Sequence, residues 1–273
     1  MFKFLKRKSD PNSFFSHYSL HDKLGEGGYG RVLRCIHKKT GVVRAVKIVH
    51  DTKYRRKTWC ENRQLNMPDE IVLWERSAHS SVVKLRDLYV EEEFWLSVMD
   101  YDPEFVDLSK LLATSGALTS ESASDVIRQV IDVISHLRSV GVDHRDIKDE
   151  NILYNPRTRL IKLIDFGSAS PLKDGAYTKL QGTEGSIPPE IYLRGSYEWE
   201  GGVVWSVGCL AYSLIRGHVP YTTKEEVLSE RELEWNYSED SRAIHFVKQC
   251  LVYNVANRCS FSQITQHPWL LGK

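Results

Sequence analysis

Two kinds of hydrophobic pattern follow one another along the chain. In the first third, short apolar runs rich in β-branched residues predominate, as at residues 31–36, 42–49 and 94–98. Runs of this length bounded by turn residues are typical of β-strands. One helix is predicted near residues 68–77, with Pro68 close to its first turn. The first part of the chain is therefore expected to be rich in strands.

Helical spacing takes over after residue 103. Residues 120–140 and 240–252 carry apolar side chains three or four positions apart, which predicts amphipathic helices. Either Thr119 or Ser120 suits the N-cap of the first of these helices. Residues 203–215 are apolar on nearly all sides, which is typical of a helix buried inside a helical lobe.

These patterns predict an α+β protein with two lobes. We expect a strand-rich lobe over residues 18–98, a connection at 99–106 and a helix-rich lobe at 107–271. Residues 1–17 are expected to be a basic, solvated tail, with a nuclear-targeting or membrane-surface role as the alternative. The basic residues of this tail are Lys3, Lys6, Arg7 and Lys8.

The overall composition excludes several classes of protein. The chain has 273 residues with 37 Lys and Arg, 36 Asp and Glu and a net charge of +1, which disfavours a dedicated nucleic-acid binder. No apolar run reaches the 18 residues of a membrane span. Five scattered cysteines form no CxxC pair, which favours reduced thiols. We expect a cytoplasmic or nuclear protein, monomeric and without nucleic-acid partners.

Charge is distributed unevenly despite this balance. Residues 53–63 are basic without a clear period, and we expect them to form a mobile loop. Residues 91–107 are acidic. The acidic stretch is interpreted either as a solvated rim or as a surface that attracts a basic partner.

A glycine-rich segment is the first candidate for chemistry. Residues 25–30 read GEGGYG, which fits the pattern G-x-G-x-x-G. A dinucleotide-binding turn would be followed by a helix, but residues 31–36 are strand-like. The segment is therefore either a flap whose backbone covers phosphate groups or an ordinary β-hairpin.

Lys47 lies on the strand after this segment and could neutralise phosphate charge. Its ammonium would need a carboxylate to hold it in place. Glu70, at the start of the predicted helix 68–77, is the natural candidate. Spacing alone leaves three alternatives open, namely Glu61, Asp69 and Glu75.

The most informative stretch is residues 144–151, which read HRDIKDEN and match H-R-D-x-x-x-x-N in full. Residues 165–167 read DFG and residues 188–190 read PPE. Each short motif alone could occur by chance. Their joint occurrence in this order, after the glycine segment and Lys47, indicates phosphoryl transfer.

At these residues the chain resembles the eukaryotic protein kinases, over about residues 18–271, and is most similar to the Pim family of Ser/Thr kinases. The stretches that carry the resemblance are 144–153, 162–168, 172–174, 177–178, 182–183, 188–190 and 267–269. The resemblance implies the bilobal protein-kinase fold, ATP as the phosphoryl donor, and Mg²⁺ with Mn²⁺ as an alternative ion.

The resemblance also implies catalytic roles. Asp146 would orient the substrate hydroxyl and accept its proton, and Lys148 would stabilise the transferred γ-phosphoryl group. Asn151 and Asp165 would supply oxygen ligands to the metal ion.

Nucleotide binding would use residues from both predicted lobes. Lys47, paired with Glu70, would hold the α- and β-phosphates, and the backbone near Met99 and Tyr101 would meet the adenine edge. The full expected set is Leu24, Gly25, Gly27, Gly28, Gly30, Val32, Ala45, Lys47, Met99, Tyr101, Asp107, Leu153, Ile164 and Asp165.

Further expectations concern the segment after Asp165. Thr183 should contact the catalytic loop, which we define as residues 144–151, and Glu190 should pair with Arg258. A phosphate on Tyr177, Thr178 or Ser186 could order this segment by pairing with Arg145. Val203 stands where most kinases have an aspartate, and the Pim family is also apolar there.

The leading hypothesis is an active Ser/Thr protein kinase whose substrates carry basic residues N-terminal to the phosphoacceptor. The acidic residues that motivate this preference are Asp102, Glu104, Asp107, Asp149 and Glu150. The alternative is a pseudokinase scaffold that binds nucleotide without efficient transfer, although Lys47, Glu70, Asp146, Asn151 and Asp165 are all present. A small-molecule kinase of the same fold is disfavoured by the PPE segment and Arg258.

Overall fold

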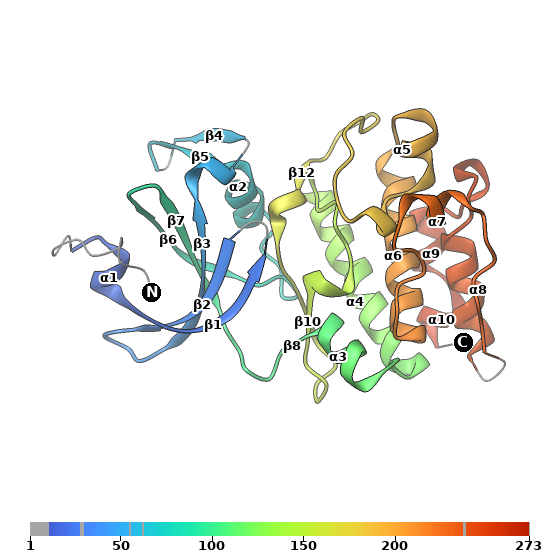
Figure 1. The fold of residues 1–273 in the computed structure, drawn as a ribbon, viewed down its shortest axis with the longest axis horizontal. Coiled ribbons are helices and arrows are strands. Elements are labelled where there is room, and N and C mark those ends of the chain that lie inside the picture. The colour runs from blue at the N-terminus through green and yellow to red at the C-terminus, as the bar shows by residue number, and fades with distance from the viewer. Residues whose placement is uncertain (1–10, 28–29, 55, 62, 237–238, 273) are drawn as a thin grey trace. The chain divides into compact units, whose positions relative to one another are not determined.

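The computed structural model describes residues 11–27, 30–54, 56–61, 63–236 and 239–272, and the chain divides into two compact units. The first unit comprises Met1–Ala78 and Val83–Pro103, and the second comprises His79–Val82 and Glu104–Lys273. Strands dominate the first unit and helices the second, which confirms the α+β class (Figure 1). The basic residues between Lys3 and Lys8 lie outside the described residues.

Four residues inside the expected strand-rich lobe belong to the second unit instead. They are His79–Val82. The backbone N–H of Leu163 donates to the Ser81 carbonyl over 2.8 Å, and Val82 forms a parallel bridge with Leu163. Residues 79–82 therefore extend the small sheet of the second unit.

A five-stranded antiparallel sheet forms the first unit, in the order β1–β2–β3–β7–β6. Its strands are β1 (Tyr18–Gly27), β2 (Gly30–His37), β3 (Val43–His50), β6 (Leu85–Glu91) and β7 (Phe94–Asp100). The three apolar runs of the sequence thus form β2, β3 and β7, as predicted. Val46, Leu96 and Val98 point into the core on one side of this sheet and are fully buried.

The residues just before Tyr18 contribute to this core, contrary to the expected solvated tail. α1 (Phe14–His17) places Phe14 against the sheet with no exposed surface. The Phe14 ring stacks on Tyr18 at 5.3 Å between centroids, and its backbone N–H donates to Glu91 over 2.6 Å. An aromatic side chain buried in this way stabilises the fold, which a solvated tail would not do.

The basic stretch 53–63 is likewise not a simple loop. β4 (Lys57–Cys60) and β5 (Leu65–Pro68) form an antiparallel hairpin that leads into α2 (Asp69–Arg76), the helix expected at 68–77. One face of the hairpin packs Leu65 and Met67 into an apolar cluster with α2. This long-range packing explains why the charge pattern alone was misleading.

The second unit contains eight helices among its described residues (Figure 1). They are α3 (Leu108–Ser115), α4 (Ser120–Ser139), α5 (Pro189–Arg194), α6 (Trp199–Arg216), α7 (Lys224–Leu228), α8 (Ser241–Cys250), α9 (Phe261–Thr265) and α10 (Pro268–Leu271). The apolar α6 is buried between α4, α8 and α9, as its all-round hydrophobicity predicted. Thr119 caps α4 by accepting from the Ser122 N–H, and Asp240 caps α8.

Short strands frame the catalytic loop. β9 (Val142–Asp143) precedes it and pairs with β12 (Ser170–Pro171). β10 (Ile152–Tyr154) follows it and pairs with β11 (Ile161–Leu163) and β8 (Val106–Asp107). Because both ends of the loop are hydrogen-bonded into sheets, its few residues have little conformational freedom.

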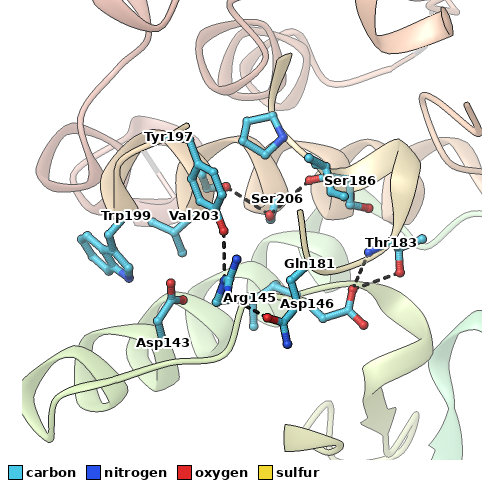
Figure 2. Close-up of a pocket in the computed structure, with 14 residues that line it drawn as sticks. Asp143, Arg145, Asp146, Gln181, Thr183, Ser186, Tyr197, Trp199, Val203 and Ser206 are labelled. Carbon is cyan, nitrogen blue, oxygen red and sulfur yellow. Dashed lines mark hydrogen bonds between the residues drawn. The ribbon is translucent and has the colours of Figure 1, made fainter. Parts of the chain in front are cut away.

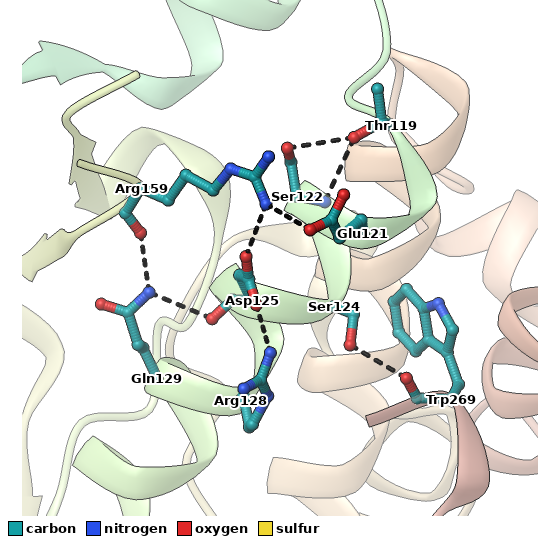
Figure 3. A network of polar contacts seen from close by, with 9 residues as sticks. All are labelled: Thr119, Glu121, Ser122, Ser124, Asp125, Arg128, Gln129, Arg159 and Trp269. Atoms are coloured by element: carbon teal, nitrogen blue, oxygen red, sulfur yellow. Dashed lines mark hydrogen bonds and ion pairs between the residues drawn. The ribbon is translucent and has the colours of Figure 1, made fainter. Parts of the chain in front are cut away.

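A polar network ties α4 to the β10–β11 hairpin (Figure 3). Arg159 donates to Glu121 over 2.8 Å and to Asp125 over 3.1 Å. Gln129 donates to the Arg159 carbonyl over 2.8 Å and accepts from the Ile161 N–H over 3.1 Å. The turn of this hairpin and the start of β11 are therefore anchored to the long helix.

Two further observations concern the described helices and the five cysteines. Among the described residues, none of the helices combines the length and the hydropathy that a membrane crossing requires. The five cysteines are all free thiols.

The expected ion pair between Glu190 and Arg258 is present and buried. The guanidinium of Arg258 meets both carboxylate oxygens at 2.9 Å, with 1% and 6% of the Arg258 and Glu190 side chains exposed. The guanidinium also lies over the Trp205 ring at 4.9 Å. The pair thus joins α5 and α6 to the loop after α8.

Replacing Arg258 by Leu should destabilise the protein by about 3–5 kcal/mol, because Glu190 is left as a buried, unpaired charge. Arg157→Leu is the matched control, since the Arg157–Glu104 pair is exposed and should contribute less than about 1 kcal/mol. The free energies of unfolding from urea titrations would measure both effects. Equal losses for the two variants would contradict the expectation.

Candidate active site

The glycine-rich segment is the tip of a β-hairpin. β1 and β2 pair up to Gly27 opposite Gly30, and Gly28 lies outside the described residues. Gly30 has φ +140°, and a Cβ atom there would lie 2.4 Å from the Ile48 carbonyl oxygen, so only glycine fits. Gly25 lies opposite Val32 in the same hairpin, one residue after Leu24.

Lys47 forms its ion pair with Glu70, one of the four candidate partners. Its Nζ lies 2.6 Å from Glu70 Oε1, and the two side chains are only 12% and 8% exposed. Asp69 instead accepts from the Thr58 hydroxyl, and Glu75 pairs with Arg63 at 2.5 Å. The sequence left this choice open, and the packing of α2 against the sheet decides it.

The remaining nucleotide-binding candidates of the first unit lie at the end of β7. Met99 is opposite Ala45 in the β3–β7 pairing, and both are buried. Tyr101 follows directly after β7. Met99 therefore lies on β7 next to Ala45 and Lys47 on the adjoining β3, and Tyr101 comes just after β7.

Asp146 is the centre of the polar contacts in the catalytic loop. Its Oδ1 accepts from the backbone N–H of Thr183 at 3.0 Å and from the Thr183 hydroxyl at 2.9 Å. Its Oδ2 accepts from Asn151 Nδ2 at 2.9 Å. Both oxygens are thus oriented by hydrogen bonds, and the predicted contact of Thr183 with the catalytic loop is present. Figure 2 shows the two bonds between Asp146 and Thr183.

Lys148 completes this group. Its Nζ donates to the Thr183 hydroxyl over 2.6 Å and lies 2.5 Å from Glu150 and 3.5 Å from Asp146. Burial lowers the pKa of Lys148, but Glu150 and Asp146 outweigh burial and hold that pKa above its ordinary value. The ammonium therefore stays charged beside Asp146 at neutral pH.

The two expected metal ligands provide suitable oxygen atoms. Asn151 uses its Nδ2 to donate to Asp146, which leaves its amide oxygen available as a ligand for an ion. Asp165 adopts a left-handed backbone (φ +63°) and accepts from the Gly167 N–H over 3.2 Å. Within the described residues, no three His, Cys, Asp or Glu side chains cluster for a metal. Mg²⁺ commonly needs only one or two carboxylates plus phosphates, so the donor set fits.

The other candidates of the second unit lie on the strands around the loop. Leu153 is paired with Asp107 in the β10–β8 register, and Asp107 also caps α3 by accepting from the Lys110 N–H. The Ile164 N–H donates to the Asn151 carbonyl over 2.9 Å, and the Ile164 carbonyl contacts the ring of His144 at 3.2 Å. Asp165 is thereby tied to the catalytic loop.

Sequence reasoning missed the residues that engage Arg145. The guanidinium donates to the Tyr197 hydroxyl over 3.1 Å and to Gln181 Oε1 over 2.8 Å (Figure 2). It also donates to the Lys179 carbonyl over 2.8 Å. It also lies over the Tyr177 ring at 4.7 Å. No local pattern marks Gln181 or Tyr197, because these contacts form only when the segment after Asp165 folds back.

The structure thus gathers the candidates into two sets, one within each unit. In the first unit, Ala45 and Lys47 lie on β3 beside the glycine hairpin, and Lys47 pairs with Glu70. In the second unit, Asp146 and Asn151 share a hydrogen bond near Asp165. The two sets carry the residue types that phosphoryl transfer needs, namely phosphate-neutralising lysines, a carboxylate beside the hydroxyl site and oxygen ligands.

These features define a protein kinase domain, and comparisons with known proteins agree. A protein-family model described as the protein kinase domain matches residues 18–270. Serine/threonine-protein kinase pim-2 of Danio rerio is 31% identical over 277 residues, covering 98% of this chain and 89% of pim-2. The chain belongs to the protein kinase family, among the serine/threonine-protein kinases. The resemblance to the Pim family is thereby confirmed.

Other relatives share only part of their length with this chain. Calcium-dependent protein kinase 27 of Arabidopsis thaliana is 33% identical, over 93% of this chain and 54% of the relative. Serine/threonine-protein kinase prk-2 of Caenorhabditis elegans is 29% identical, over 95% of this chain and 59% of the relative. The chain spans little more than half of these two proteins.

Proposed function

We propose that this protein is a catalytically active, ATP-dependent Ser/Thr protein kinase. The observation that carries the proposal is the orientation of Asp146 by Thr183 and Asn151, with the Lys148 ammonium beside it. A substrate hydroxyl oxygen would attack the γ-phosphorus, and the bond from that phosphorus to the ADP oxygen would break. Asp146 would accept the hydroxyl proton, and Lys148 would offset charge on the phosphoryl oxygens.

Nucleotide binding is proposed for the expected residues of each unit. The glycine hairpin and Lys47 would hold the phosphates, and the backbone near Met99 and Tyr101 would contact the adenine. Asn151 and Asp165 would hold a divalent ion, which would neutralise charge on the β- and γ-phosphates when bound. We propose Mg²⁺ as that ion, with Mn²⁺ as the alternative.

The test of activity is phosphate transfer from Mg-ATP to a degenerate library of Ser- and Thr-containing peptides. Transfer above that of an Asp146→Asn control supports an active kinase. A wild type that binds ATP but transfers no more phosphate than the control would favour the pseudokinase scaffold. The intact set of Lys47, Glu70, Asp146 and Asn151 supports the active form.

We further propose that substrates carry Arg or Lys N-terminal to the phosphoacceptor. Among the acidic residues that motivate this preference, Glu104 and Glu150 keep about half of their side-chain surface exposed. The Glu104–Arg157 pair is exposed on both sides and weak enough for a substrate cation to compete, whereas Glu150 also holds Lys148, whose side chain is 20% exposed. Asp149 is buried, with a pKa raised by burial, and contributes less to the preference.

Removing these carboxylates should weaken recognition of basic peptides. We expect Glu104→Gln with Glu150→Gln to raise KM for an Arg-containing peptide about tenfold, since each exposed pair contributes up to about 1 kcal/mol. KM for the same peptide with Ala in place of Arg should not change. The pair of peptides separates lost charge recognition from general damage, and equal KM changes for both would argue against the preference.

Activity should not require phosphorylation of the segment after Asp165. Arg145 already binds uncharged groups there, and Tyr177 is buried. We expect Thr178→Ala to keep kcat within about twofold, as for other exposed substitutions. A peptide assay on phosphatase-treated wild type and variant would measure this. A large loss in either sample would indicate a phosphate-dependent switch.

The cellular location of the protein, its oligomeric state and the bounds of its domain are also proposed. We propose a monomer located in the cytoplasm or nucleus, which the five free thiols support. We also propose protein substrates without nucleic-acid partners. The proposed kinase domain covers residues 18–271, with a hinge at 99–106.

A further inference from the structure

One buried carboxylate beside the catalytic loop takes no part in the chemistry proposed above. Asp143 is the last residue of β9, and only 7% of its surface is exposed. It faces the same small pocket of the second unit as Arg145, Tyr197 and Val203 (Figure 2). A buried charge is costly unless nearby groups stabilise it, so its retention needs a physical reason.

The backbone conformation of Arg145, two residues further along the chain, provides a reason to keep this carboxylate. Arg145 has φ +63°, in the left-handed region that non-glycine residues avoid. Such a conformation persists only where the surroundings over-determine it. Gly182 supports it from one side, because a Cβ atom there would lie 2.7 Å from the Arg145 carbonyl oxygen.

The α6 side of the pocket offers the loop no carboxylate among the residues that line it. Val203 is apolar, and the Ser206 hydroxyl is directed at the carbonyls of Gly202 and Ser186, at 3.1 and 3.4 Å. Asp143 and Asp146 are the two carboxylates among the residues that line this pocket, and both oxygens of Asp146 already accept from Thr183 and Asn151. Asp143 precedes Arg145 by two residues and is the remaining carboxylate beside its backbone. The acceptor therefore comes from the strand that enters the loop.

Three charged or titratable side chains face Asp143. They are Arg145 from the loop itself, Tyr177 from the segment after β12, and Tyr197 from the residues before α6. Burial raises the pKa of Asp143 to about 6, against the opposing effects of Tyr177 and Arg145. Asp143 is therefore ionised at pH 7.5 and largely protonated at pH 5.5.

We propose that Asp143 is a positioning residue, whose carboxylate holds the Arg145 backbone in its left-handed conformation and thereby aims the neighbouring Asp146. This inference rests on the proposed kinase activity for its kinetic consequences, but its structural part does not depend on that activity.

The first test is Asp143→Asn, which keeps the shape of the side chain and removes its charge. We expect kcat at pH 7.5 to fall about tenfold or more, because a small displacement of Asp146 is costly, with KM for ATP within about twofold. Asp132→Asn on the exposed side of α4 is the matched control and should leave kcat unchanged. An unchanged kcat in Asp143→Asn would overturn the proposal.

The pH dependence separates positioning by charge from a general structural role. Groups other than Asp143 are common to both proteins, so their pH effects cancel in the ratio of wild-type to Asp143→Asn kcat. That ratio should decrease toward one between pH 7.5 and pH 5.5, as Asp143 in the wild type takes up its proton. A ratio that stays constant over this range would contradict the proposal.

Amide hydrogen exchange provides a test that needs no activity. Peptides covering residues 144–148 should exchange at least severalfold faster in Asp143→Asn than in wild type, whereas peptides from α8 should not change. Equal exchange at 144–148 would overturn the proposal even if the wild type proved to be inactive. Asp143→Ser carries the same expectation, and it replaces Asp143→Asn if the latter lacks a cooperative melting transition.

Discussion

Asp146→Asn should lower kcat about a thousandfold while leaving KM for ATP nearly unchanged, as expected for loss of a general base. The wild-type carboxylate has Oδ1 held by Thr183 and Oδ2 by Asn151. Asparagine can keep one of these contacts but cannot take up the proton of the substrate hydroxyl. The corresponding loss of transition-state stabilisation is about 4 kcal/mol. Steady-state transfer from Mg-ATP to a Ser-containing peptide would measure it.

Two controls make this result specific. The melting temperature of Asp146→Asn should be close to that of the wild type, since Asn has almost the same volume. Thr183→Ala should give a smaller loss of kcat, because it removes one hydroxyl that orients Asp146 but leaves the backbone contact at 3.0 Å. An Asp146→Asn variant that retained most of its activity would rule out the proposed base.

The second large effect is expected at the ion pair of the first unit. Lys47→Met should reduce kcat/KM by about a hundredfold to a thousandfold, as for loss of one preorganised electrostatic contact. It should also destabilise the fold by about 3–5 kcal/mol, because Glu70 is left buried without its cation. Peptide phosphorylation and urea unfolding would measure the two losses separately.

The double variant Lys47→Met with Glu70→Leu distinguishes chemistry from stability. Replacing a whole buried ion pair by apolar side chains is often neutral for stability. We therefore expect the double variant to regain most of the free energy of unfolding that Lys47→Met loses, but none of the activity. If kcat/KM recovered together with stability, Lys47 would have only a structural role.

Much of the fold followed from local patterns. Apolar spacing predicted α4, α6 and α8, and Thr119, one of the two N-cap candidates for α4, is the residue that caps it. Short apolar runs predicted β2, β3 and β7. These elements are set by side chains a few residues apart, so the sequence contains the necessary signal.

The candidate site was predictable to the extent that its motifs are short. The spacing between Asp146 and Asn151 placed both residues in one loop, where they share a hydrogen bond of 2.9 Å. The partners of Arg145 were not predictable, since Gln181 and Tyr197 approach it from distant positions in the chain. Asp143 carried one weak signal, a carboxylate next to the apolar end of a strand.

By itself, the sequence determined the class of protein, the order of its elements and the residues of the catalytic loop. Only the tertiary structure decided that Glu70 pairs with Lys47, that Phe14 belongs to the core and that residues 57–68 form a hairpin. It alone decided that Asp143 is buried. The physical reason is that burial and ion pairing depend on which distant segments meet, and the free energy of those contacts overrides local preference.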